Sequence, residues 1–390
     1  MEAKSEHSRY PADNSLNIVR LGLAVLVIYA HAFYIVGAGT GPNVHGENLG
    51  GFAVFGFFAV SGYLVTHSRI TRPLGVYLVH RLARLLPAFW VCLLVMVGLF
   101  GPVGYLLERG TLDGYLTSVT NPLNYVFSNM FLRVSAYDIA GTPSSVPFPG
   151  VWNGSIWTLY YEFVCYMILA GYVSVRLVRR YAWQSMLLLW VGLSLAYALW
   201  PHGLDVLAGG NHELGTLLKL SAVFMGGALL RLLPWRIRYR PLPALAAAVC
   251  WTAIVWFGGS AGPQFGAPLL AYVLLTVGLY LPRVNWLQKH DFSYGVYIFA
   301  FPVQQLIVML GVGSANVWIH SATALALTAP LAIASWFLVE RPVMRRARAA
   351  GRSGGLPAVG LAGDVTSRGS VQASVASPEP SSGERAIGPA

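Results

Sequence analysis

Two ionisable residues in the first long apolar stretch, Arg20 and His31, are spaced to share one face of a helix. They lie 11 residues apart, which at about 100° per residue is within about 20° of three full turns. A helix would separate them by about 16 Å along its axis. A guanidinium can hold an anion, and an imidazole can take and return a proton near neutral pH. The alternative is a snorkelling arginine and a hydrogen-bonded interior histidine.

A second pair of cations, Arg81 and Arg84, lies at the start of a later apolar stretch. Residues at i and i+3 are neighbours on a helix surface. Two guanidiniums at a membrane surface fit a phosphorylated ligand, because each can donate two parallel hydrogen bonds to it. Anchoring of the topology and binding of anionic lipid explain the same spacing equally well.

A carboxylate, Glu162, lies about one turn inside another apolar stretch. Ionisable groups are costly in a bilayer, so each is a candidate for function. Glu162 could orient a catalytic histidine, act as a base or bind an acceptor hydroxyl, or it could pair with a tyrosine in a structural role. Trp157 and Tyr161 precede it and are candidates for substrate contact, although tryptophan is also typical of the interfacial aromatic belt.

Other polar residues are better explained by structure. Ser61 precedes Gly62, a combination that more often permits close helix packing than it supplies a nucleophile, and no G-x-S-x-G motif is present. Asp291 is placed to cap a helix, and Pro342, two residues after Glu340, predicts that the last helix ends there. The sequence has no nucleotide-binding or zinc motif, and its three cysteines have no metal-ligand spacing. No metal centre is expected.

The elements that position these residues are predicted membrane spans. Of the 390 residues, 56% are hydrophobic and 11% are charged, whereas soluble domains carry about a quarter charged residues. This composition excludes a soluble enzyme and a disordered chain. The net charge of +11 is compatible with nucleic-acid binding, but the cations lie at the ends of apolar runs, as in membrane proteins.

Apolar runs of about 20 residues, the length that spans a bilayer, recur ten times. They lie at about 16–38, 50–68, 82–104, 156–176, 182–200, 214–233, 242–258, 266–282, 293–311 and 319–340. We therefore expect an all-α integral membrane protein with about ten transmembrane helices.

The distribution of Lys and Arg predicts the orientation of these spans. With the N-terminus in the cytoplasm, nearly all cations fall on inner loops, and the outer loops carry Asp and Glu instead. Both termini are therefore expected to be cytoplasmic. A signal peptide cleaved near residues 30–32 is the alternative, but the apolar run continues past that point, and the remaining spans would lose the charge alternation.

Three parts of the chain are expected. Residues 1–15 form a cytoplasmic segment, residues 16–346 the ten-helix membrane domain, and residues 347–390 a disordered cytoplasmic tail rich in Gly, Ser, Ala and Pro. A long outer loop covers residues 105–155, and loops of this length are usually functional or disordered.

Taken in chain order, the motifs resemble acyltransferase family 3, a group of integral-membrane, mostly bacterial O-acyltransferases. The resemblance covers residues 14 to about 346 and rests on Arg20-x10-His31, Phe57-Phe58-Ala-Val-Ser61-Gly62, Arg81-Leu-Ala-Arg84 with Pro87, Ser155-Ile-Trp157-Thr158-Leu with Glu162, Ser293-Tyr294-Gly295-Val-Tyr297, and Glu340-Arg341-Pro342. Many relatives have a histidine before an aromatic-proline step where this chain has Phe299-Ala300-Phe301-Pro302, which places more weight on His31.

The resemblance implies transfer of an acetyl or other short acyl group from cytosolic acyl-CoA to a hydroxyl of a glycan, a lipid-linked sugar or a small acceptor. Arg20, Arg81 and Arg84 would hold acyl-CoA as a co-substrate, with no permanently bound cofactor. His31, as base or acyl carrier, and Glu162 would be catalytic. The expected location is the bacterial cytoplasmic membrane, in contact with membrane lipid and without a nucleic-acid partner.

A transporter of a polar or lipid-linked metabolite is the alternative function. Buried Arg, His and Glu side chains could form a proton-coupled pathway. The sequence shows no inverted repeat and no paired broken helices, which are typical of secondary transporters.

Overall fold

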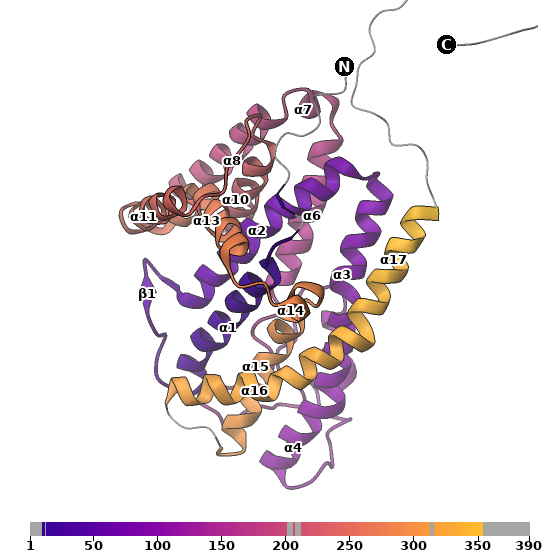
Figure 1. Ribbon diagram of the computed structural model, residues 1–390. Helices are drawn as coiled ribbons and strands as arrows, with labels where there is room; N and C mark the ends of the chain where they lie inside the picture. The colour runs from indigo at the N-terminus through magenta and orange to yellow at the C-terminus, as the bar shows by residue number, and fades with distance from the viewer. Residues whose placement is uncertain (1–9, 12, 201–205, 207–211, 313–315, 354–390) are drawn as a thin grey trace, which may run out of the picture. The chain divides into compact units, whose positions relative to one another are not determined.

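The computed structural model describes residues 10–11, 13–200, 206, 212–312 and 316–353. Within them, strands are confined to one hairpin of β1 (Asn43–Val44) and β2 (Glu47–Asn48), in which Val44 pairs with Glu47. Almost all other regular structure is helical (Figure 1). The predicted all-α class is therefore confirmed.

A helix overlaps each of the ten predicted ranges in the described part of the chain. These helices are α1 (Leu16–Ile35), α2 (Leu49–Thr71), α3 (Leu74–Val95), α6 (Thr158–Ser174), α8 (Ala182–Leu199), α10 (Glu213–Leu232), α11 (Pro241–Phe257), α13 (Ala267–Tyr280), α15 (Ser293–Met309) and α16 (Val317–Ser335). Six helical segments are long and apolar enough to cross a membrane, or seven if the bent pair that ends in α13 is one span. The count of ten spans and the cytoplasmic termini stay predictions.

Shorter helices connect or extend these ten. They are α4 (Gly101–Arg109), α5 (Pro122–Asn129), α7 (Arg176–Arg180), α12 (Gly262–Phe265), α14 (Asn285–Lys289), α17 (Arg341–Ser353), a 3₁₀ turn η2 (Gly259–Ala261) and two π-helical turns, η1 (Met96–Phe100) and η3 (Trp336–Glu340). Through η1, α3 continues into α4, and through η3, α16 continues into α17. Both helices are therefore longer than the spans predicted at 82–104 and 319–340.

The last helix does not end at Pro342, and the prediction that it would is wrong. Pro342 is the second residue of α17, directly after η3. The wider π-helical turn tolerates a residue that has no N–H and whose ring would crowd the preceding turn of a regular helix. The helix thus runs to Ser353, past residue 346, where the disordered tail was expected to begin. α17 packs against α3, and residues 354–390 of that tail lie outside the described residues.

Close contact between α2 and α10 fixes the position of Ser61. A Cβ atom added to Gly62 would overlap the carbonyl oxygen of Phe224, and one added to Gly227 would overlap that of Ala59. Glycine at such crossings lets membrane helices approach closely. The structure thus supports the packing explanation of the Ser61-Gly62 pair.

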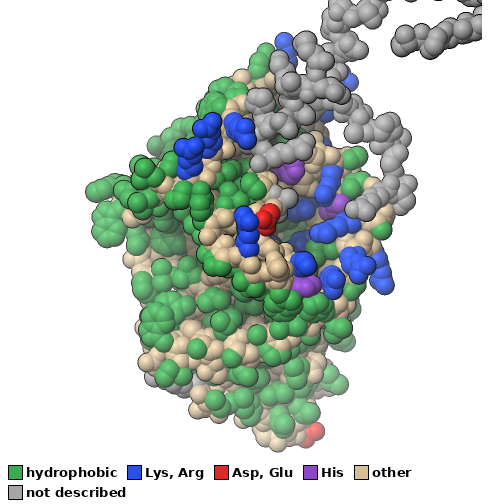
Figure 2. Space-filling model, viewed as in Figure 1, with side chains coloured by type: hydrophobic (Ala, Val, Ile, Leu, Met, Phe, Trp, Pro, Cys, Tyr) green, Lys and Arg blue, Asp and Glu red, His purple; other side chains and the backbone are tan. Residues whose placement is uncertain are grey.

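The cations gather at one end of the described helices. Figure 2 shows Lys and Arg side chains over the upper part of the view, where Figure 1 places α7, α14 and α17, whereas the lower part is mainly hydrophobic. We call this the basic end and define it by Arg72, Arg81, Arg180, Lys289 and Arg348. The positive-inside rule predicts that it faces the cytoplasm.

The long loop at 105–155 is folded against the helices. Trp152 is fully buried, and its indole N–H donates to Thr142 Oγ1 at 3.1 Å. The side-chain amide of Gln305 in α15 donates to the carbonyl oxygens of Phe148 and Val151 at 2.7 and 2.8 Å. These bonds attach the end of the loop to α15 and so position the residues that precede α6.

Candidate active site

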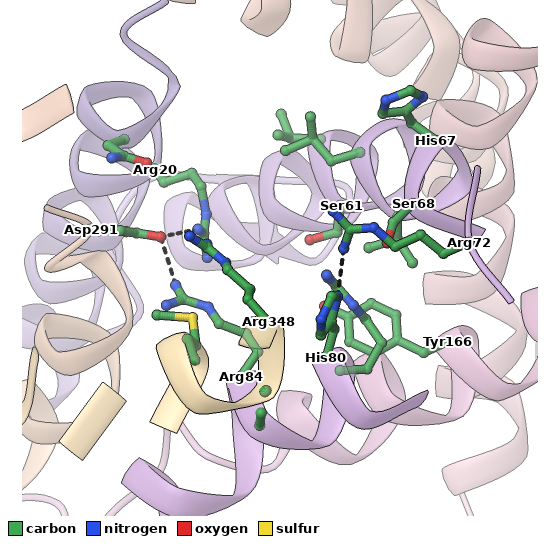
Figure 3. A pocket seen from close by; sticks show the side chains of 18 of the residues that line it. Arg20, Ser61, His67, Ser68, Arg72, His80, Arg84, Tyr166, Asp291 and Arg348 are labelled. Carbon is green, nitrogen blue, oxygen red and sulfur yellow. Dashed lines mark hydrogen bonds and ion pairs between the residues drawn. The ribbon is translucent and has the colours of Figure 1, made fainter. Parts of the chain in front are cut away.

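A cavity of about 560 Å³ opens at the basic end, between α1, α2, α3, α6, α14 and α17 (Figure 3). We call it the basic cavity. Its lining includes one carboxylate, Asp291, and six cationic side chains, Arg20, Arg72, Arg81, Arg84, Lys289 and Arg348, all within the described ranges. The three arginines that the sequence assigned to anion binding are therefore brought together from two separate helices.

Two of these arginines are already neutralised by carboxylates. Asp291 Oδ2 accepts from Arg20 Nη1 and from Arg84 Nη2, the latter at 2.7 Å. Arg84 Nη1 also donates to Glu340 Oε2 at 3.0 Å, and the Glu340 side chain is only 2% exposed. The sequence analysis treated Asp291 and Glu340 as structural residues and did not predict this network, which joins α1, α3, η3 and the start of α15.

The network holds Asp291 in its ionised form. Burial favours the neutral acid and raises the pKa of Asp291. The nearby Arg20 and Arg84 guanidiniums, together with hydrogen bonds from Ser293, outweigh burial and lower the pKa to about 2. Ser293 donates both its backbone N–H (3.2 Å) and its hydroxyl (2.5 Å) to Asp291 Oδ1. The carboxylate therefore binds the start of α15 as well as the two arginines.

Arg81 differs from Arg84, although both were predicted to bind the same ligand. No carboxylate of the described residues lies within ion-pair distance of Arg81. Its guanidinium instead lies over the ring of Tyr166, 5.6 Å from the centroid, a cation–π contact that leaves its charge uncompensated. Of the Arg81–Arg84 pair, Arg81 is thus the one available to an anion.

His31 lines a different cavity, of about 270 Å³, which we call the outer pocket. Its polar and aromatic lining includes His31, Tyr34, Glu47, Asn48, Ser155, Trp157, Thr158, Lys219 and Tyr297. His31 Nδ1 lies 3.4 Å from Ser155 Oγ, and its ring packs edge-on against Phe301, with the centroids 5.0 Å apart. Phe301 belongs to the aromatic-proline step of α15, and the folded loop before α6 supplies Ser155.

Glu162 lies between the two cavities. Its Oε1 accepts from Ser61 Oγ at 2.9 Å and from Tyr166 OH at 2.5 Å. Glu162 has no hydrogen bond to His31 in the described structure, so the geometry does not support the alternative in which it orients that histidine directly. Ser61 is a donor to this carboxylate.

The two aromatic candidates for substrate contact occupy different positions. Trp157 lines the outer pocket and is 36% exposed. Tyr161 is buried beside it, with the two rings in an edge-to-face contact at 5.6 Å. Trp157 is therefore placed to meet a ligand, and Tyr161 supports Trp157 from behind.

A small hollow of about 30 Å³ lies between the two cavities. It shares Arg20 with the basic cavity and Thr158 and Tyr297 with the outer pocket, and Glu162 also lines it. Tyr297 OH lies 2.5 Å from Thr158 Oγ1 and donates to the carbonyl oxygen of Ser155 at 3.0 Å. Arg20 and His31, predicted on one helix face, thus lie in cavities that follow one another along α1.

Comparison with known proteins decides the family. A family described as an acyltransferase domain matches residues 13–339. The chain belongs to acyltransferase family 3. This acyltransferase 3 protein is similar to an O-acetyl transferase of Shigella phage Sf6, with 28% identity over an alignment of 341 positions that covers 85% of this chain and 96% of that protein.

Nodulation protein 10 of Rhizobium leguminosarum bv. viciae is also similar, with 26% identity over an alignment of 373 positions that covers 88% of this chain and 96% of that protein. No solved structure matches the acyltransferase 3 protein. Together, the family and these relatives support O-acyl transfer by a multi-pass membrane protein. The resemblance seen in the sequence motifs is confirmed.

Proposed function

We propose that this protein transfers an acetyl or other short acyl group from acyl-CoA in the basic cavity to a hydroxyl of an acceptor in the outer pocket. The observation that carries the proposal is the arrangement of the two cavities, because one gathers cations and the next contains His31. The O-acetyl transferase name of the phage relative supports an acetyl group.

Charge supports the basic cavity as the site of the donor. CoA carries a diphosphate and a phosphomonoester, and guanidiniums bind such groups with charge-assisted hydrogen bonds. The pantetheine arm would run past Glu162 toward His31. Because the small hollow is too narrow for it, Tyr297 has to give up its contact with Thr158 when the arm enters.

In the reaction, His31 acts as general base. It takes the proton of the acceptor hydroxyl as the hydroxyl oxygen attacks the carbonyl carbon of the thioester. A C–O bond forms and the C–S bond breaks. The departing CoA sulfur then takes the proton from His31, so the products are an ester and the free thiol, and the imidazole is again neutral.

The aromatic and hydrogen-bonding groups of the outer pocket support it as the site of the acceptor. Trp157 and Tyr34 offer aromatic faces, Asn48 offers an amide, and the charges of Glu47 and Lys219 neutralise each other in an ion pair. A hydroxylated acceptor without net charge, such as a glycan, the sugar of a lipid-linked precursor or a small molecule, fits this lining. With the basic end in the cytoplasm, as the charges predict, donor and acceptor approach from opposite sides of a bacterial cytoplasmic membrane.

The donor half of this proposal is tested by binding. Acetyl-CoA is titrated calorimetrically into the purified full-length protein in detergent and into two variants, Arg81→Ala and Arg109→Ala. Arg109 is a matched control, because it ends α4 and does not line the basic cavity. We expect saturable binding by the wild type and Arg109→Ala, and a strong loss in Arg81→Ala.

A failure of the wild type to bind acetyl-CoA would favour the transporter function. If the folded wild type does not bind acetyl-CoA at millimolar concentration, acyl transfer from this cavity is wrong. Uptake of a polar metabolite into proteoliposomes without acyl-CoA would then identify a transporter.

A further inference from the structure

Arg72 and Arg348 project into the basic cavity, although neither is among the arginines that the sequence assigned to anion binding. Arg72 directly follows the last residue of α2, and Arg348 lies on α17, the helix that continues past Pro342. Figure 3 shows the two side chains reaching into the cavity from opposite sides. Because α17 is longer than predicted, it adds Arg348 to the cavity. The cavity thus contains more cations than the three arginines predicted from the sequence.

The cationic side chains of the cavity fall into two classes. Arg20 and Arg84 contact Asp291, and Arg84 also contacts Glu340. In the described ranges, none of the carboxylates lies within ion-pair distance of the other four, Arg72, Arg81, Lys289 and Arg348. The second class thus has no counter-charge from the protein.

The three uncompensated guanidiniums are close enough to affect one another. Burial lowers the pKa of Arg72, and the charges of Arg81 and Arg348 lower it further. The one hydrogen-bond partner that the described residues give the Arg72 guanidinium is neutral: Nη1 lies 2.5 Å from His80 Nδ1. Like charges held together in this way repel each other, and a ligand with several negative charges removes that repulsion.

We propose that Arg72, Arg81 and Arg348 form the subsite for the phosphate groups of the donor, whereas Arg20 and Arg84 hold the cavity wall together. This inference rests on the proposed function. Arg72 and Arg348 are exposed at the cavity rim, which suits a phosphomonoester that remains near solvent while the arm of CoA enters the protein. Within the subsite, Arg72 and Arg348 are thus assigned to the 3′-phosphate, and Arg81, deeper in the cavity, to the diphosphate.

The test pairs the removal of an arginine with the removal of a phosphate. CoA, 3′-dephospho-CoA and pantetheine are titrated into the full-length wild type and into the variants Arg348→Ala, Arg72→Ala and Arg345→Ala. Arg345→Ala is the matched control, because it removes the same charge from the same helix and Arg345 does not line the basic cavity. Thermal melting confirms that each variant is folded.

We expect Arg348→Ala and Arg72→Ala to weaken CoA binding about tenfold to a hundredfold, the usual effect of losing a hydrogen bond between charged groups. Binding of 3′-dephospho-CoA should change by less than about threefold, so the preference of the wild type for CoA should disappear. Arg345→Ala should bind CoA within about twofold of the wild type.

Three results would overturn the inference in different ways. If both variants bind CoA as the wild type does while Arg81→Ala fails, the donor site stands and the subsite is wrong. If the folded wild type does not bind CoA, the proposed function is wrong as well. If phosphatidylglycerol in nanodiscs displaces CoA from the wild type but not from Arg348→Ala, the subsite binds a lipid phosphate instead.

Discussion

The basic cavity and the outer pocket hold their charges differently. In the basic cavity, six cationic side chains face one carboxylate, and four of the cations have no counter-charge from the described residues. In the outer pocket, the single lysine of the lining is paired with Glu47. A surplus of charge selects an anion at long range, whereas a balanced pocket selects by shape and hydrogen bonds.

This difference separates the two substrates by chemistry. The cations of the basic cavity would attract a phosphorylated donor, whereas the outer pocket would offer it no net electrostatic attraction. A neutral acceptor has the reverse preference. Each of the following changes acts on one side of the small hollow, so its effect should appear for one substrate and not for the other.

The largest expected effect is that of His31→Ala. The variant should lose about a hundredfold to ten-thousandfold in the rate of transfer, because the general base is removed. Donor binding should stay within about twofold of the wild type, since His31 does not line the basic cavity. The rate of transfer is measured with a labelled acetyl group, and donor binding is measured by calorimetry with CoA. Normal transfer by this variant would exclude His31 as the base.

Arg84→Ala should mainly destabilise the fold. Its removal leaves Glu340 and Asp291 buried with less counter-charge, and breaking such a buried pair costs about 3–5 kcal/mol. Thermal melting in detergent should show this loss, and adding Glu340→Gln should recover part of it. If Arg84→Ala melts like the wild type but no longer binds CoA, Arg84 is a ligand for the donor and the two-class description of the cavity is wrong.

The pH dependence of stability offers a second test of the same network. The folded-state pKa of Asp291, about 2, lies below the usual value of about 3.9. Its contribution to stability, about 2 kcal/mol, is thus fully present above pH 4 and is lost as the pH falls toward 2. Asp291→Asn should lower stability at neutral pH and reduce the slope of melting temperature against pH in this window. An unchanged slope would contradict the network.

The sequence predicted where single residues lie along a helix better than it predicted their partners on other helices. Spacing along one helix placed Arg20 and His31 on the same face of α1, and the structure has them in successive cavities. Helix periodicity describes one element at a time. It therefore could not predict the contacts of Asp291 with Arg20 of α1 and Arg84 of α3. The sequence did contain a usable signal. A carboxylate beside an apolar span is costly unless it is paired, and many Arg residues were available to pair with it.

The ends of the helices were the second feature that the sequence did not predict correctly. The rule that proline stops a helix is local, and it assumes regular α-helical geometry in the preceding turn. The π-helical turn η3 changes that geometry, so α17 continues and brings Arg348 to the basic cavity. The helix propensity of the Met, Arg and Ala residues at 344–350 favoured this continuation, and packing against α3 stabilises it.

The variant Ser61→Ala tests whether Ser61 is a nucleophile or only a hydrogen-bond donor to Glu162. Ser61 Oγ donates to Glu162 Oε1 at 2.9 Å, and losing one hydrogen bond to a charged group costs about 1.5–3 kcal/mol. Transfer should therefore fall by roughly tenfold to a hundredfold, without loss of donor binding. Complete inactivity together with a labelled serine ester in the wild type would show that Ser61 carries the acyl group.

The smallest expected effect is that of Trp157→Leu, which tests the acceptor side. Trp157 contributes a partly exposed aromatic face to the outer pocket, and Tyr161 supports it from behind. An aromatic contact is worth about 0.5–1.5 kcal/mol, so KM for the acceptor should rise about twofold to tenfold. The Kd for CoA should not change, and Tyr161→Phe, which keeps the supporting ring, should leave both constants within about twofold. A change in CoA affinity without a change in acceptor KM would mean that the acyl chain of the donor, rather than the acceptor, occupies the outer pocket.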